Sequence, residues 1–279
     1  QCQSRDVDGD GDIGDADDLT ACPTFQVENF SGGNPGLEAE EADTFNVGVV
    51  YEPIENLNLK LDVYKTEINN AITQISLQNL LDLEIEGASL PPGTYIQRGA
   101  PTTGSQGQSV PGRILEIGTG FANVATLEVD GWDLNVNYSM DTNVGRFSFD
   151  LTHSNIDTYD FTSLPGEDPV NQVGTRGAPD SRTSFQGVWS MNEHTVALNT
   201  YMIAETDGST DSFKVPSFTN HNLTYIYNTS WDADITFGIR NVTDEQPSID
   251  QAEGWTGNFE PQLYDVYGRT PYISYKQRF

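Results

Sequence analysis

Regularly spaced acidic residues near residue 1 are the side chains best suited to chemistry. Within the segment 6–17, aspartates occupy every second position from Asp6 through Asp8 and Asp10 to Asp12, and another, Asp17, closes it. Hard divalent cations prefer oxygen ligands, and Ca²⁺ takes six to eight of them. So many neighbouring carboxylates would repel one another without a counter-ion. The spacing therefore predicts a calcium site, and a solvated acidic segment without metal is the alternative.

The segment resembles the twelve-residue calcium loop of EF-hands. With Asp6 as the first position, Gly11 supplies the sharp turn at the sixth and the backbone carbonyl of Asp12 serves the seventh. Ile13 gives the apolar eighth position, and Asp17 gives the acid at the twelfth. A final aspartate makes the dockerin-type variant the nearer match. This resemblance implies Ca²⁺ as a cofactor that rigidifies a surface loop.

The only two cysteines, Cys2 and Cys22, bracket the acidic segment. This placement predicts a disulfide formed in an oxidising compartment. Closing such a loop would contribute on the order of 3 kcal/mol in the chain-entropy view. Two unpaired thiols, or a partner elsewhere, are the alternatives.

Composition limits the class of protein. The 279 residues carry a formal net charge of −29, which argues against nucleic acid as a partner. Solubility in a salty medium is the plain interpretation of this charge, and attraction of cations is the sharper one. Only 36% of residues are hydrophobic, and no run approaches the roughly 20 apolar residues of a membrane helix. That composition still suits membrane β-barrels, because only every second strand residue must be apolar.

Period-two alternation runs through the chain. Between Ala233 and Val242, apolar residues alternate with polar ones that include Asp234 and Arg240. Nine segments of this kind are expected to be strands: Phe45–Tyr51, Leu57–Val63, Phe121–Met140, Phe147–Leu151, Thr183–Met191, Thr195–Ile203, Asn220–Tyr227, Ala233–Val242 and the segment that ends at Phe279. The fold class predicted is all-β, an antiparallel transmembrane barrel with one face toward lipid. The polar, turn-rich stretch Asn69–Pro111 is expected to be a long loop.

Connections between these strands alternate between short turns and long loops. Outer-membrane barrels have short periplasmic turns and longer extracellular loops. A periplasmic C-terminus would then place the N-terminal segment outside the cell. Nine is an odd number, whereas bacterial single-chain barrels have even numbers of strands. The chain is therefore expected to be the C-terminal part of a longer polypeptide, with a small closed barrel of eight to ten strands as the alternative.

Four stretches together resemble the C-terminal barrel portion of a TonB-dependent outer-membrane receptor. They are Asn34–Pro53, Leu57–Ile72, Phe121–Tyr138, and Gly238–Pro247 followed by the closing strand. The resemblance covers about Asn34–Phe279, in the family's order. Ala39 departs from it where the family usually has proline, and Val242 and Thr243 replace leucine and phenylalanine.

The resemblance implies a 22-stranded barrel with an N-terminal plug, in the outer membrane of a Gram-negative bacterium. It implies as partners the remaining barrel and plug of the same receptor, TonB through the plug, and outer-membrane lipid with lipopolysaccharide. A surface lipoprotein is a possible further partner. The expected domains are an extracellular calcium-type loop, 1–33, and barrel, 34–279. The implied function is TonB-dependent uptake of a scarce nutrient such as an oligosaccharide or a siderophore.

The alternative function is a calcium-loaded barrel serving adhesion or assembly without transport. No catalytic motif supports an enzyme. The tryptophans Trp132, Trp189 and Trp231 suit an interfacial girdle. Aromatic residues of the last loop have two interpretations, contact with a substrate such as a sugar or an aromatic chelate, or simple packing of the loop: Trp255, Phe259, Tyr264 and Tyr267. Charged residues expected to form ion pairs along the barrel wall or to face the plug, rather than to bind substrate, are Lys60, Asp62, Arg146, Asp150, Asp234 and Arg240.

Overall fold

The computed structural model describes residues 27–103, 109–208, 213–249 and 259–278. Contacts divide the chain into two compact units. The first comprises, among the described residues, 27–38 and most of 72–124. The second comprises Ala39–Ala71 with Ala125–Phe279. The predicted division at residue 33 stays a prediction, since residues 1–26 of the expected calcium-type loop lie outside the described residues.

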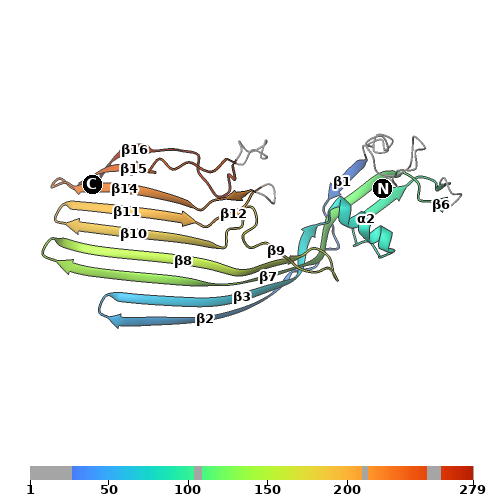
Figure 1. Ribbon diagram of the computed structural model, residues 1–279, viewed down its shortest axis with the longest axis horizontal. Helices are drawn as coiled ribbons and strands as arrows, with labels where there is room; N and C mark the ends of the chain where they lie inside the picture. The colour runs from blue at the N-terminus through green and yellow to red at the C-terminus, as the bar shows by residue number, and fades with distance from the viewer. Residues whose placement is uncertain (1–26, 104–108, 209–212, 250–258, 279) are drawn as a thin grey trace. The chain divides into compact units, whose positions relative to one another are not determined.

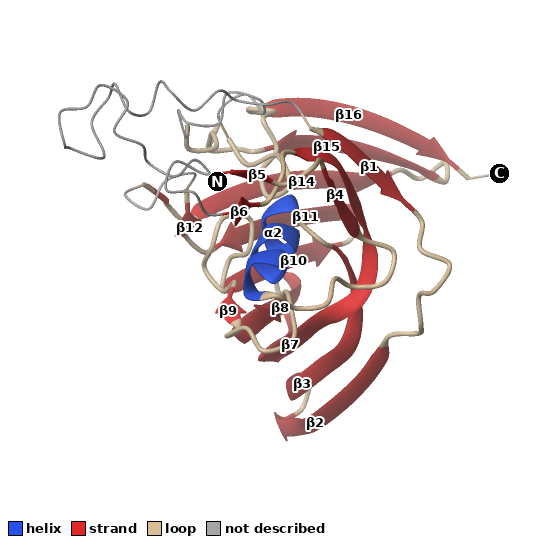
Figure 2. Cartoon of the chain, turned by 90° about the vertical axis from the view of Figure 1, so that its right-hand side faces the viewer, coloured by secondary structure: helices blue, strands red, loops and turns tan. Residues whose placement is uncertain are grey.

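Nine strands pair in sequence along one antiparallel path, as Figure 1 shows. The path confirms the predicted all-β fold and the predicted order of segments. Its members are β2 (Glu41–Ile54), β3 (Leu57–Gln74), β7 (Ile114–Thr142), β8 (Gly145–Thr162), β10 (Ser181–Met191), β11 (His194–Ile203), β14 (Phe218–Asn228), β15 (Ala233–Arg240) and β16 (Thr270–Gln277). In Figure 2 these strands follow one another around an arc from β2 to β16. Among the described residues, the outer edges of β2 and β16 pair with no strand.

Short turns join consecutive strands at one end of this sheet (Figure 1). Asn56, Asn192 and Asp232 adopt positive φ in three of them, where the small polar side chain tolerates the left-handed conformation. After the remaining short turn, between β7 and β8, Gly145 begins β8 with a φ of 116°. Turn chemistry therefore fixes each hairpin register, and the residues responsible were recognisable from the sequence.

Longer connections leave the other end of the second unit. Between β8 and β10, the chain adds β9 (Val170–Asn171), which pairs with β8. Between β11 and β14, β12 (Thr206–Asp207) pairs with β13 (Lys214–Val215). The last connection, from β15 to β16, carries no strand among its described residues. Long loops are therefore gathered at the end opposite the turns.

The first unit is built on the beginning of β7. Strand β1 (Glu28–Gly32) pairs with it in parallel, and β4 (Tyr95–Arg98) pairs with it on the other side. Helix α2 (Leu77–Glu86) begins at Ser76, whose hydroxyl accepts from the backbone of Asn79, and ends at left-handed Gly87. The short strands β5 (Thr102–Thr103) and β6 (Ser109–Val110) pair with each other. Prediction of a single long loop over Asn69–Pro111 was therefore wrong.

Side chains of α2 explain why the helix was missed. Only Leu80 is fully buried, and acids interrupt the apolar pattern, so ten residues give little helical periodicity. The guanidinium of Arg98 on β4 joins the Glu84 carboxylate at 2.5 Å and the Gly112 carbonyl at 3.0 Å. The hydrogen bond from Arg98 holds the pKa of Glu84 below its usual range. This ion pair attaches the helix to the strands. No helix of the described residues is long and apolar enough to cross a membrane.

Candidate functional site

Register gives the nine-strand sheet two chemically distinct faces near its short turns. Residues opposite each other share a face, so cross-strand pairs define both sides. The apolar face contains, for example, Val49 opposite Leu61, Tyr138 opposite Phe149, Trp189 opposite Val196, and Phe237 opposite Ile273. The polar face contains, for example, Asn137 opposite Asp150, Gln186 opposite Asn199, and Thr236 opposite Ser274. A continuous apolar face over all nine strands is what a lipid-facing barrel wall requires.

Predicted wall ion pairs form in part. Lys60 contacts Asp62 at 2.7 Å along β3. Asp234 pairs with Arg278 at 2.5 Å, and Arg146 lies 3.7 Å from Asp141.

Two expected members of this wall network make other contacts. The carboxylate of Asp150 accepts from the Asn137 amide at 2.6 Å, and the Arg240 guanidinium lies 5.5 Å from the Tyr272 ring centre. The polar face thus satisfies much of its charge internally.

Tryptophans predicted for an interfacial girdle occupy different environments. Trp189 donates its indole N–H to the Val144 carbonyl at 2.7 Å, beside a short turn. Trp132 packs on His153 with ring centres 5.1 Å apart, while Trp231 is 56% exposed. Of the three, half-buried Trp189 with its satisfied indole N–H best suits a membrane–water boundary.

A small apolar cluster ties the long loops of the second unit together. Ile203 at the end of β11, Val215 on β13 and Phe218 on β14 are all buried, and Tyr264 joins them from the last loop. Rings of Phe218 and Tyr264 meet edge-on with centres 5.2 Å apart. The cluster therefore anchors the last loop to the ends of three strands.

Polar contacts reinforce this loop cluster. The guanidinium of Arg176, in the loop after β9, lies 3.0 Å from the carboxylate of Glu260 in the last loop. The backbone N–H of Asp207 donates to the Gly174 carbonyl at 2.7 Å. Three loops distant in sequence are thereby fixed to one another.

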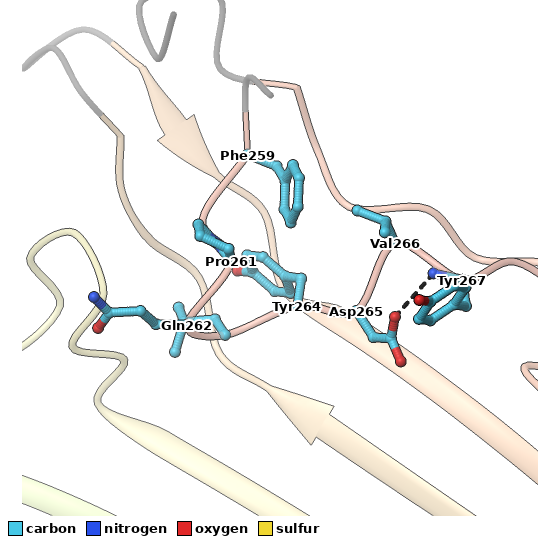
Figure 3. Close-up of a pocket in the computed structure, with 8 residues that line it drawn as sticks. Phe259, Pro261, Gln262, Tyr264, Asp265, Val266 and Tyr267 are labelled. Carbon is cyan, nitrogen blue, oxygen red and sulfur yellow. Dashed lines mark hydrogen bonds between the residues drawn. The ribbon is translucent and has the colours of Figure 1, made fainter. Parts of the chain in front are cut away.

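The predicted aromatic contact residues of the last loop separate into two roles. Figure 3 shows the open pocket that this loop forms, lined by residues 259 and 261–267. Tyr264 is only 6% exposed, and its hydroxyl makes no hydrogen bond with the described residues although buried Thr206 is near. Burial raises its pKa. Tyr267 is 75% exposed, and partly buried Phe259 packs on the apolar cluster.

Truncating Tyr264 should therefore loosen the loops. We expect Tyr264→Ala to cost about 3 kcal/mol locally, because a buried ring leaves a cavity. Limited proteolysis of the folded protein should then cut the last loop several-fold faster. Tyr267→Ala is the matched control and should leave the rate within twofold; equal rates for the two variants would contradict the anchoring role.

Buried Asn241 closes the base of the same loop and was not singled out as a site residue. Its amide donates to the Glu245 carbonyl, and its side-chain oxygen accepts from the Glu245 N–H, both at 2.8 Å. Beyond it, the Asp244 carboxylate accepts from the Arg269 N–H at 2.7 Å, and the Arg269 side chain donates to the Val242 carbonyl at 2.8 Å. Two stretches that carried the family resemblance thus meet in space. Positive φ angles at Asn241 and Asp244 mark this loop base in the structure, and the alternation of residues in the sequence does not reveal them.

The remaining predicted site residues lie outside the described part of the chain. They are Asp6, Asp8, Asp10, Asp12, Asp17, Cys2, Cys22 and Trp255. Within the described residues, no group of three or more His, Cys, Asp or Glu side chains could hold a metal ion. Calcium and the disulfide therefore stay predictions.

Comparison with known proteins gives one family match. The family described as TonB dependent receptor-like, beta-barrel matches residues 15–242. No curated protein matches the chain in sequence.

Several solved structures share the fold. The siderophore receptor PirA from Acinetobacter baumannii superposes with a TM-score of 0.57 at 15% identity, over 89% of this chain and 33% of that one. The ferric enterobactin receptor PfeA from Pseudomonas aeruginosa gives 0.56 at 16%, over 88% and 32%. The FrpB iron transporter from Neisseria meningitidis gives 0.55 at 11%, over 89% and 33%. The chain thus spans about a third of the length of the solved structures it matches, and identities this low are evidence of fold alone.

Proposed function

Because the chain belongs to the TonB-dependent receptor-like β-barrel family, we propose that it supplies barrel wall and extracellular loops for active uptake of a scarce nutrient across the outer membrane. The solute would be an oligosaccharide, a siderophore or a similar organic molecule. The family is a receptor family and not an enzyme family, and it belongs to the outer membrane of Gram-negative bacteria. The observation that carries the proposal is the apolar face that continues across nine strands beneath clustered long loops.

Other strands are needed to complete such a barrel. An unpaired strand edge in hydrocarbon leaves backbone groups without partners, at several kcal/mol for each. The outer edges of β2 and β16 are therefore proposed to pair with the remaining strands of the same receptor. Its plug would receive energy from TonB, and outer-membrane lipid with lipopolysaccharide would surround the apolar face.

Orientation follows from loop length. Short turns are proposed to face the periplasm together with the C-terminus, which places the long loops and the N-terminal segment outside the cell. A surface lipoprotein that hands solute to those loops is a further partner we propose. Protease added to intact cells should cut within 163–180 or 241–269 and spare the turn at Asn192.

Energy dependence tests the proposed transport. Cells producing the complete receptor should accumulate its solute, identified by competitive growth on nutrient mixtures, only when TonB is intact. Deleting TonB should reduce accumulation to the level of cells without the receptor. Undiminished accumulation without TonB would contradict the proposal.

An alternative role is adhesion or assembly by a calcium-loaded barrel without transport. The acidic segment 6–17 favours this role, since a rigid calcium loop on a surface suits attachment. Cells lacking the receptor would then lose calcium-dependent attachment while growing normally on every nutrient tested.

Calcium binding by segment 6–17 is proposed independently of transport, and these residues lie outside the described part of the chain. Coordination by Asp6, Asp8, Asp10 and Asp17, with the Asp12 carbonyl, would be favoured by a disulfide between the two cysteines. Calorimetry on the oxidised peptide 1–25 should show heat of binding at millimolar calcium or below. A peptide with Asp8→Asn and Asp10→Asn should lose it, and no heat from the parent peptide would contradict the site.

A further inference from the structure

The two faces of the second unit exchange character toward the loop end. In β7, alternate residues from Asp133 through Asn135 to Asn137 lie on the polar face, and the same side continues to Val129 and Leu127 without interruption in β7. The opposite side of β7, apolar nearer the turns, carries Asp130 and Glu128 at this height. One face of the sheet thus becomes apolar where the other becomes charged.

A β-bulge in β8 extends this exchange to the neighbouring strand. Gly131 lies opposite Ile156, and Asp130 lies opposite Thr158, so Asp157 is the extra residue. A bulge shifts every later side chain to the other face. Tyr159 and Phe161 consequently stand beside Val129 and Leu127 instead of pointing with the charged residues.

The result is an aromatic patch, defined as Tyr64, Leu127, Val129, Tyr159, Phe161 and Val170. Val170 of β9 lies opposite Phe161, which itself lies opposite Leu127, so three strands contribute one row. Val170 is 59% exposed, and the other five are half-buried. The Tyr64 hydroxyl lies toward Gly131, where an added Cβ would be 2.9 Å from it, so Tyr64 belongs to the same side.

The side of the sheet opposite the aromatic patch is charged. The ammonium group of Lys65 pairs with the Glu128 carboxylate on that side. Apolar side chains lower the free energy only where their surface leaves water. Their collection on one side of the sheet would therefore bring no advantage if both sides faced water equally. Gathering on the polar face of the wall places them where a solute would pass.

A row of polar groups lies next to the patch on the same face. Asp133 is opposite Ser154, and Ser154 is opposite Arg182. Asp133 follows Val129 by four positions along β7, so this row lies roughly 13 Å from the Val129–Tyr159 row. Arg182 is exposed and makes no ion pair within the described residues. Apolar lining with a few convergent polar groups is the usual composition of a site for small molecules.

We propose that the aromatic patch and the adjoining row bind an amphipathic organic solute, with a ring or aliphatic body on the patch and a polar group at Arg182. This inference rests on the proposed transport function and names the class of solute. An anionic group is favoured at Arg182, because an exposed guanidinium offers paired N–H donors to a carboxylate or sulfonate. A surface that served only to pack another part of the receptor would not need such a cation beside it.

The probe chosen is 8-anilinonaphthalene-1-sulfonate, which combines aromatic rings with one anionic group. Fluorescence titration of the complete receptor in lipid nanodiscs, with empty nanodiscs subtracted, should show saturable binding. Phe161→Ser and Arg182→Gln should each weaken binding at least fivefold. Val129→Ser provides a second test of the patch should Phe161→Ser fail to fold, as judged by heat-modifiable electrophoresis.

Matched controls come from the opposite side of the same strand. Asp160→Ser and Thr158→Ser should leave the dissociation constant within twofold, since both residues alternate with the patch in β8. The proposal would be overturned if the two control variants weakened binding as much as Phe161→Ser and Arg182→Gln do. Binding no greater than that of empty nanodiscs would also overturn it.

Accessibility separates a solute site from a surface covered by the receptor itself. In intact cells, Tyr159→Cys should react with a polar maleimide, and the probe should slow that reaction; the parent chain, with Cys2 and Cys22, is the blank. No reaction would mean that another segment covers the patch, which overturns the inference. Binding of the probe does not need TonB. Absence of probe binding together with TonB-dependent uptake would contradict this inference alone. Probe binding without TonB-dependent uptake would contradict the transport function alone.

Discussion

Replacing Gly131 by valine is expected to leave little folded receptor in the outer membrane. A Cβ at this position would lie 2.2 Å from the Asn155 carbonyl oxygen and 3.1 Å from the Ile156 Cα. Both obstacles are backbone, so no side-chain rotation relieves them, and the bulge that turns Tyr159 toward the polar face would be lost. We expect a cost on the order of 4 kcal/mol or more. Heat-modifiable electrophoresis of outer-membrane fractions measures the folded amount.

A glycine with free space provides the control for that substitution. Gly32 on β1 has no heavy atom within 4 Å of an added Cβ and no positive φ. Gly32→Val should therefore fold at the parental level. Equal folded amounts of Gly131→Val and parent would show that the backbones of β7 and β8 do not approach each other closely at Gly131.

Placing arginine at Leu198 is expected to destabilise the barrel by about 2–4 kcal/mol, the range for a cation on the lipid face near the bilayer midplane. Leu198 lies midway along β11, opposite Gly187 on one side and Leu223 on the other, and its side belongs to the apolar face. The midpoint of urea unfolding, followed in lipid vesicles, should fall accordingly.

The neighbouring position on β11 supplies the matched variant. Asn199 points to the polar face, where its side chain accepts from the Gln186 amide at 2.7 Å. Asn199→Arg should cost no more than about 1 kcal/mol, the value of one exposed hydrogen bond. A larger loss at Asn199 than at Leu198 would reverse the assignment of the two faces.

Hairpins and faces could be predicted from sequence because local chemistry determines both. Alternation in Leu57–Val63 and Ala233–Arg240 specifies a strand with one apolar side, and Asn192 marks a turn by its tolerance of positive φ. These signals need only a few adjacent residues. The nine-strand order then follows, because each strand pairs with the next along the chain.

Features that depend on distant partners were not predictable. Strand β7 begins at Ile114 rather than Phe121, and its first residues pair with β1 and β4, which are distant in the sequence. Helix α2 is held by the Arg98–Glu84 ion pair, whose members are 14 residues apart. The Asp157 bulge is visible only from the register with β7.

The candidate site shows the same division. Aromatic composition drew attention to the last loop, yet it could not separate buried Tyr264 from exposed Tyr267, because burial depends on Phe218 and Val215 of other segments. Asn241 looked like one polar residue at a strand end. Its structural role needs Glu245 and a positive φ, and neither can be inferred from alternation.

The alternation of environments along β11 tests the central claim, that this sheet is the wall of an outer-membrane barrel, most directly. Nitroxide labels placed singly from Thr195 to Met202 in the complete receptor in lipid bilayers would report collisions with oxygen, which concentrates in lipid, and with a water-soluble nickel chelate. At Val196 and Leu198 oxygen collisions should dominate, and at Ala197 and Asn199 the nickel chelate or neither reagent should. Equal nickel accessibility at all four positions would contradict a membrane wall.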